Sequence, residues 1–251
     1  MKSFIFCTSY INNSSEEFSR LRYRKWIDNY NRLADQLGVE YLFLIDDGSA
    51  DAYVGDDVAV ISHLLPDTLS HRVNLVHFPD NLGRRSENDY AGWWRSFAFS
   101  WEVARKYHFE KIIHVESDFF VLSQALLDFI RNRNNGWTGL FSSYYNFPES
   151  AIQVIVKDAF PSLGTIYQRA VQSNYRFSGI AERTLPFTDV VKHFRGDRLG
   201  EIVVLKQWVK DKTYCLPAEV DYVGQLPTVL PVPDAKDVQR LIHAYASTLV
   251  E

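Results

Sequence analysis

The chain begins with two short apolar runs separated by one helix-length segment, and this order restricts the fold more than any other feature. Residues 3–8 are almost continuously apolar, as in a strand buried on both faces. Apolar residues then recur at three- and four-residue spacing up to Leu37, and Gly38 follows where a helix would end. A second apolar run covers 40–46. Strand, helix and strand in this order predict a right-handed parallel unit.

The same alternation continues through the first half of the chain. A strand is predicted at 73–78, a helix at 90–106, a strand at 111–115, and a helix at 124–133 that Ser123 would cap. The pattern is weaker later on, where the expected elements are strands at 151–156, 201–205 and 213–217 and a helix within 234–249. We therefore expect an α/β protein with a mostly parallel central sheet flanked by helices. A chain of 251 residues suits one structural domain of this kind.

Charge and composition exclude several classes of protein. The net charge is −4, so the basic face that nucleic acid would need is not expected. With only two cysteines, no disulfide framework is implied. No apolar stretch is long enough to cross a membrane, and the N-terminal run is too short for a signal segment, which favours a cytoplasmic protein. A basic cluster on the first helix, predicted to face outward, carries the further hypothesis of peripheral contact with anionic lipid: Arg20, Arg22, Arg24 and Lys25.

Polar residues gather where three of the predicted strands end. These clusters are Thr8–Tyr10, Asp46–Ser49 and Glu116–Asp118. In an open α/β sheet, ligands bind beyond the carboxyl ends of the strands, so the three clusters should converge. Two carboxylate-bearing ends facing one crevice suit Mg²⁺ or Mn²⁺ shared with phosphate oxygens. Taken alone, Asp46–Ser49 is better explained as a plain turn, because Asp, Gly and Ser favour turns.

With these motifs in order, the chain resembles the glycosyltransferases of the GT-A fold, the nucleotide-diphospho-sugar transferase superfamily. Leu44–Ser49 resembles the family's strand that ends in an acidic pair, and Asn81–Arg84 resembles its Asn-x-Gly step before a helix. Ile112–Asp118 resembles the acidic Asp-x-Asp element, with Glu116 in place of the first aspartate. The resemblance covers about the first half of the chain. It implies a nucleotide-sugar-binding half at 1–120 and an acceptor-binding half at 121–251, continuous with each other.

The resemblance also implies roles for single residues. The nucleotide would be contacted by Thr8, Ser9, Tyr10, Asp46, Asp47, Asn81, Gly83 and Arg84. Asp118 would be the principal ligand of Mn²⁺ or Mg²⁺. Glu116 would point toward the ribose or the metal, and its extra methylene puts direct ligation in doubt. His114, inside the preceding strand, is interpreted as a core histidine rather than a metal ligand.

An enzyme that inverts the configuration of the sugar also needs a carboxylate base for the acceptor hydroxyl. Asp189, interpreted as opening a helix, and Glu182 are the preferred candidates, and Asp197 and Glu201 compete with them. A retaining enzyme would need none of these.

The activity that the resemblance implies is metal-dependent transfer of a hexosyl group from a nucleotide-diphosphate sugar to a saccharide or glycolipid acceptor, in surface polysaccharide synthesis. The alternatives are a sugar nucleotidyltransferase and a non-catalytic nucleotide- or carbohydrate-binding protein of the same fold. The segment after the first predicted strand, Thr8–Asn13, contains no glycine, which counts against the nucleotidyltransferase. The Glu116 departure is what supports the non-catalytic protein.

Overall fold

The structure, a computed structural model, describes residues 1–12, 16–86, 88–142, 145–198, 219–238, 240, 241 and 244, with only the backbone of residue 197. Its main feature is an eight-stranded sheet with the order β3-β4-β2-β1-β5-β8-β7-β9. The strands are β1 (Ser3–Ser9), β2 (Tyr41–Asp46), β3 (Val58–Ser62), β4 (Val73–His77), β5 (Lys111–Val115), β7 (Trp137–Ser142), β8 (Phe147–Val156) and β9 (Asp189–Val191). Every neighbouring pair is parallel except the two that involve β8. The predicted α/β class with a mostly parallel sheet is confirmed.

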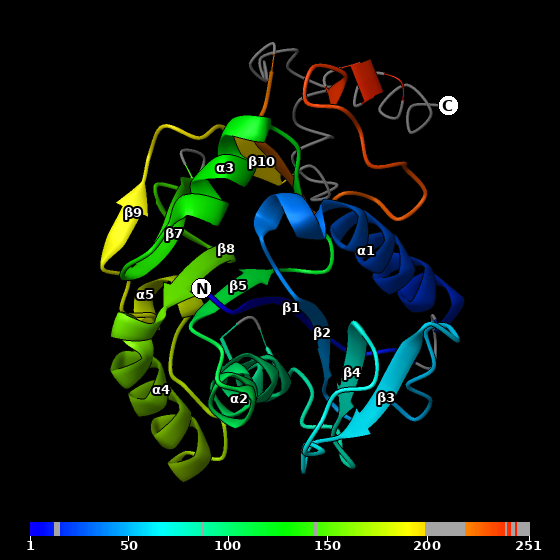
Figure 1. Cartoon of the computed structure of the whole chain (residues 1–251), viewed down its shortest axis with the longest axis vertical. Helices are drawn as coiled ribbons and strands as arrows, with labels where there is room; N and C mark the ends of the chain where they lie inside the picture. Colours follow the sequence, from blue (N-terminus) through cyan, green and yellow to red (C-terminus); the bar gives the residue numbers. More distant parts are fainter. Residues whose placement is uncertain are drawn as a thin grey trace.

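Helices cover both faces of this sheet (Figure 1). The main helices are α1 (Glu16–Leu37), α2 (Ala91–Tyr107), α3 (Gln124–Asn132) and α4 (Phe160–Gln172). Residues of α1 and α3 share one apolar core with one side of the sheet, whereas α2 and α4 share a second core with the other side. The periodic spacing of apolar residues in α1 and α2 explains this placement, since each helix buries one stripe against the strands.

A second, three-stranded sheet lies beside the main one and joins distant parts of the chain. Its order is β10-β11-β6, formed by Gly196–Arg198, Tyr222–Gly224 and Phe120–Val121. The short β6 follows directly on the acidic end of β5, so this sheet brings Arg198 toward the same edge as Glu116–Asp118. Two short helical segments, η2 (Lys157–Ala159) and α5 (Ala181–Thr184), complete the described elements.

The sheet crosses the boundary at residue 120 that separates the two predicted halves. Strand β8 pairs with β5 over five residue pairs, from Lys111 with Val156 to Val115 with Ile152. The two halves therefore share one sheet. The expected strands at 201–205 and 213–217 and most of the expected helix within 234–249 lie outside the described residues.

Candidate functional site

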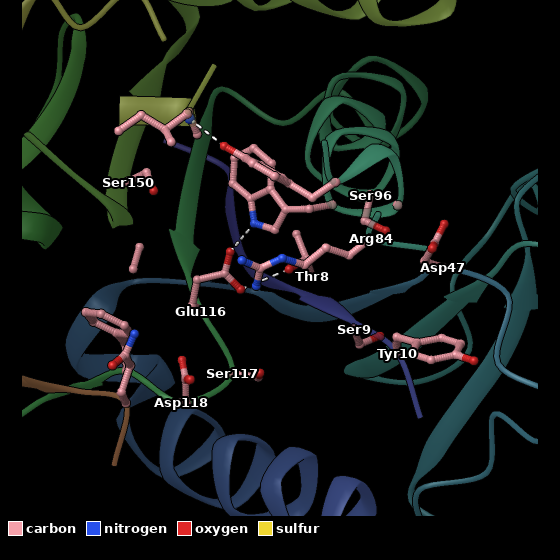
Figure 2. A pocket seen from close by; sticks show the side chains of 18 of the residues that line it. Thr8, Ser9, Tyr10, Asp47, Arg84, Ser96, Glu116, Ser117, Asp118 and Ser150 are labelled. Carbon is pink, nitrogen blue, oxygen red and sulfur yellow. Dashed lines mark hydrogen bonds between the residues drawn. The ribbon is translucent and has the colours of Figure 1, made fainter. Parts of the chain in front are cut away.

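A cavity of about 810 Å³ opens at the carboxyl ends of the parallel strands. Figure 2 shows the end of β1, Asp47 after β2 and the Glu116–Asp118 end of β5 around it. The three polar strand ends therefore meet, as the sequence predicts. Of the residues proposed from sequence, the cavity is lined by Thr8, Ser9, Tyr10, Asp47, Gly83, Arg84, Glu116, Asp118 and Glu182. Asp46, Asn81 and Asp189 are not among its lining residues.

Asp46 is a structural residue of the turn that follows β2. Its carboxylate has no exposed surface, and it accepts hydrogen bonds from the Ser49 backbone amide at 2.8 Å and from the Ser49 hydroxyl. The His77 ring Nδ1 lies 2.9 Å from Oδ2, the oxygen that also accepts from the Ser49 amide. Asp46 was expected to contact the base or ribose. In the structure its oxygens are turned away from the cavity and hold the turn, which is the alternative that the turn-forming composition offered.

Asp47 lies at the cavity wall and fastens the loop that follows β4. Its Oδ2 accepts from the Asn81 side-chain amide at 2.9 Å and from the Gly83 backbone amide at 2.9 Å. Its Oδ1 forms a buried ion pair with Arg95 of α2. Burial raises the pKa of Asp47, although the Gly83 amide and Arg95 act in the opposite direction. Asn81 thus supports Asp47 rather than facing the ligand space.

Gly92, in the first turn of α2, makes this arrangement possible. A Cβ at this position would lie 1.9 Å from Asp47 Oδ2, so any larger residue would displace the carboxylate. Trp93 and Ser96 of the same helix also line the cavity. These residues form a face of α2 that lines the cavity. No role in the site is predicted for this face from the apolar stripe of the helix alone. Their three- and four-residue spacing beside that stripe was the available signal.

Glu116 is held by three side chains from three different elements. Its Oε2 accepts from the Thr8 hydroxyl at 2.9 Å, its Oε1 accepts from the Trp93 indole N–H, and His114 Nε2 lies 3.3 Å from Oε1. Burial opposes the charged form, but His114, Trp93 and Thr8 together lower the pKa of Glu116. His114 is fully buried as expected, and it is also an electrostatic partner of Glu116.

Asp118 differs from Glu116 because none of the described side chains hydrogen-bonds to its carboxylate. Its backbone carbonyl accepts from the Leu226 amide at 3.1 Å, which fixes the main chain. Burial raises the pKa of Asp118 to about 6, with Glu116 adding to the increase and Arg22 opposing it. Asp118 therefore carries a carboxylate that is oriented by its backbone and open to a ligand.

A divalent cation fits this site through Asp118. Within the described part of the chain, no group of three or more His, Cys, Asp or Glu residues is arranged to hold a metal ion. Magnesium does not require such a group, since it is commonly bound by one or two carboxylates together with substrate phosphates and water. The open carboxylate of Asp118 meets that requirement, whereas both oxygens of Glu116 already have protein partners.

A bulge in β8 forms the cavity wall that lies opposite these strand ends. The pairing of β7 with β8 passes from Gly139–Gln153 directly to Leu140–Glu149, so residues 150–152 fall between two pairs. Ser150 and Ala151 line the cavity as a result. The Ser150 hydroxyl donates to Glu182 Oε1 at 2.7 Å. A bulge in a long strand thus orients the carboxylate of Glu182 in α5.

Arg198 adds a charge to this side of the cavity. Its guanidinium donates to both oxygens of Glu149, at 2.7 and 2.5 Å, and lies 3.5 Å from Glu182 Oε1. Glu149 is 1% exposed, so the bidentate pair with Arg198 compensates a buried charge. This pair is not predictable from the sequence, because the two residues are far apart in the chain and have no motif in common.

The other acids proposed as a base are placed differently. Asp189 begins strand β9 rather than a helix, because the adjacent Thr188 amide bonds to the Trp137 carbonyl at the edge of the sheet. Its carboxylate pairs with Arg133 at 2.9 Å and does not line the cavity. The side chain of Asp197 and the whole of Glu201 lie outside the described residues.

The basic cluster of α1 is not a free positive surface. Arg20 pairs with Glu16 and Asp51, and Arg24 pairs with Asp28 and Asp57. Lys25 donates to three backbone carbonyls of the segment Pro227–Leu230. Arg22 was expected on the outer face but lines the cavity instead. Among the described helices, none is both long and apolar enough to cross a membrane.

Comparison with known proteins gives a distant structural match. No protein-family model matches the chain, and no curated protein sequence matches it. The chain is similar to the crystal structure of a glycosyltransferase involved in the glycosylation of the major capsid of PBCV-1. The two share 11% sequence identity with a TM-score of 0.43, over 90% of this chain and 94% of the other. At this level of similarity, function has to be argued from the cavity itself.

Proposed function

We propose that this chain is a metal-dependent glycosyltransferase that moves a hexosyl group from a nucleotide-diphosphate sugar to a saccharide or glycolipid acceptor, in surface polysaccharide synthesis. The observation that carries the proposal is a single cavity with the open carboxylate of Asp118 on one side and the oriented carboxylate of Glu182 on another. A transferase that inverts the configuration of the sugar needs both, because one group must bind the leaving diphosphate and another must take the proton of the acceptor hydroxyl.

The donor side would be formed by the strand ends. Thr8, Ser9, Tyr10, Gly83 and Arg84 line this part of the cavity and are the candidates for contacts with the nucleotide. Arg84 extends into the space in Figure 2 and can donate to phosphate. Asp118 would hold Mn²⁺ or Mg²⁺. When bound, the cation would neutralise charge on the departing nucleoside diphosphate.

The acceptor side would be formed by Glu182 and its neighbours. The Ser150 hydroxyl and the Arg198 guanidinium both face Glu182 Oε1, which keeps the carboxylate oriented. As a general base, Glu182 would take the proton from the acceptor hydroxyl. Aromatic side chains line the same cavity and offer apolar faces for sugar rings: Tyr90, Trp93, Tyr145 and Phe147. Tyr145 and Phe147 are stacked, with ring centroids 5.4 Å apart.

The test is release of nucleoside diphosphate from a panel of nucleotide sugars, with Mn²⁺, Mg²⁺ or EDTA and with saccharide acceptors. We expect cation-dependent turnover, and a loss of about 10²- to 10⁴-fold in kcat for Glu182→Gln with little change in nucleotide affinity. Asp189→Asn tests the competing base. A loss in that variant with Glu182→Gln unaffected would contradict the assignment.

Two other outcomes would replace the proposal. Release of pyrophosphate from a nucleoside triphosphate and a sugar phosphate would identify a nucleotidyltransferase. Nucleotide binding with no turnover of any donor, either to an acceptor or to water, would identify a binding protein of the same architecture.

A further inference from the structure

Arg22 differs from Arg20 and Arg24 of the α1 cluster because, among the described residues, no carboxylate pairs with it. It lines the cavity, and its Nε is buried without a hydrogen-bond acceptor. Its Nη2 donates to the Tyr23 hydroxyl at 2.9 Å, and within the described residues its guanidinium forms no ion pair. A partly buried guanidinium with an unsatisfied N–H is stabilised when a ligand supplies the missing acceptor.

The position of Arg22 is fixed by the end of β1. The Tyr23 hydroxyl accepts from the Tyr10 backbone amide at 2.6 Å and donates to the Tyr10 carbonyl at 2.8 Å. Arg22 is bonded to that same hydroxyl. Because Trp26 lies one turn further along α1 and is fully buried, the helix presents Arg22 at the edge of its buried stripe. The guanidinium is thereby held beside the strand end and not free in solvent.

Arg22 and Asp118 carry opposite charges in the same cavity but do not pair with each other. The two interact electrostatically, since Arg22 opposes the increase in the pKa of Asp118, yet no ion pair joins them. In Figure 2, α1 passes below Asp118 and Ser117. A ligand that offers a cation to Asp118 and phosphate oxygens to Arg22 would satisfy both groups. Ser9, also in this wall, has a buried hydroxyl without a partner and adds a donor for such a ligand.

From these contacts we infer that Arg22 is an anchor for the diphosphate of a nucleotide ligand and binds it through its guanidinium, independently of the metal. This inference rests on the proposed function, because it concerns the same donor. It assigns the phosphate contact to a helix that no sequence motif marked, and it explains why Arg22 alone among the cluster is turned inward.

The experiment measures binding by titration calorimetry of UDP, GDP, ADP and CDP, and of the matching nucleosides, in EDTA and in Mg²⁺. Arg22→Met removes the guanidinium, and Arg22→Lys keeps a charge. Arg24→Met is the matched control on the exposed side of the same helix. We expect Arg22→Met to weaken diphosphate binding about 10- to 100-fold, as for loss of hydrogen bonds to a charged group. Nucleoside binding should be unchanged, and Arg22→Lys should recover part of the loss.

The outcomes separate this inference from the proposed function. If the wild type binds no nucleoside diphosphate, both fail. If the wild type binds one and Arg22→Met binds it equally well, only the role of Arg22 fails. A loss seen in Mg²⁺ but not in EDTA would also overturn the inference, because Arg22 would then act through Asp118. Thermal unfolding of each variant excludes a general loss of structure.

Discussion

The acidic ends of β2 and β5 lie at the same edge of the sheet, yet their carboxylates have different partners. Asp46, the last residue of β2, and Asp47 accept hydrogen bonds from four partners: Ser49, Asn81, Gly83 and Arg95. Asp118, after β5, has an oriented backbone and an open carboxylate. The carboxylates after β2 therefore build the wall of the cavity, whereas at the end of β5 Glu116 is held by protein partners and Asp118 is available for ligands.

The largest effect is expected at Asp47. Asp47→Asn removes one partner of the buried pair with Arg95, and loss of one partner of such a pair costs about 3–5 kcal/mol in the free energy of unfolding. Urea denaturation measures this cost. Asp80→Asn is the control, since Asp80 pairs with the same arginine from an exposed position and should cost at most about 1 kcal/mol. If the two variants lost equal stability, Asp47 would be no more important to the fold than the exposed partner of Arg95.

Asp118→Asn should reduce activity without reducing stability, in contrast to Asp47→Asn. Under the proposed function it removes the ligand of the cation that stabilises the leaving group, and we expect turnover to fall by about 10²- to 10³-fold. Because burial raises the pKa of Asp118 to about 6 and no described side chain bonds to its carboxylate, the variant should be at least as stable to urea as the wild type at pH 7. Steady-state kinetics measure the turnover of this variant, and urea denaturation of the same preparation measures its stability. A large loss of stability would show that Asp118 is as structural as Asp47.

The smallest effect is expected on the acceptor side, at Ser150. Ser150→Ala removes one hydrogen bond to Glu182, and Arg198 still faces the same oxygen. We expect kcat to fall by about fivefold, equivalent to about 1 kcal/mol, with unchanged nucleotide affinity. Steady-state kinetics with a fixed donor measure it. A change in nucleotide affinity instead would place Ser150 on the donor side of the cavity.

The sequence predicts the regular first half well because its elements have strong local signals. The strands β1, β2, β4 and β5 and the helices α1, α2 and α3 occur where apolar runs or helical spacing place them. Ser123 caps α3 as expected, accepting from the Leu126 amide at 3.1 Å. Strand β3 was missed because only part of it is buried, and α4 because its first turns contain Pro161 and Gly164.

The sequence predicts which strand ends meet at the site. It does not predict which of their carboxylates are open to a ligand. That distinction depends on partners remote in sequence, since His77 is 31 residues from Asp46 and Arg95 is 48 residues from Asp47. The orientation of Arg22 was missed for a related reason, because an arginine beside a buried stripe is compatible with either face of its helix. The roles proposed for these residues stay predictions.

The continuous pairing of β5 with β8 has a mechanical consequence. A rotation of residues 121–198 against the first half would shear this backbone ladder, which lies near the centre of the sheet. Opening and closing around a substrate must therefore be local. The strand ends that carry Asp118 on β5 and Ser150 on β8 would then keep a fixed separation throughout turnover.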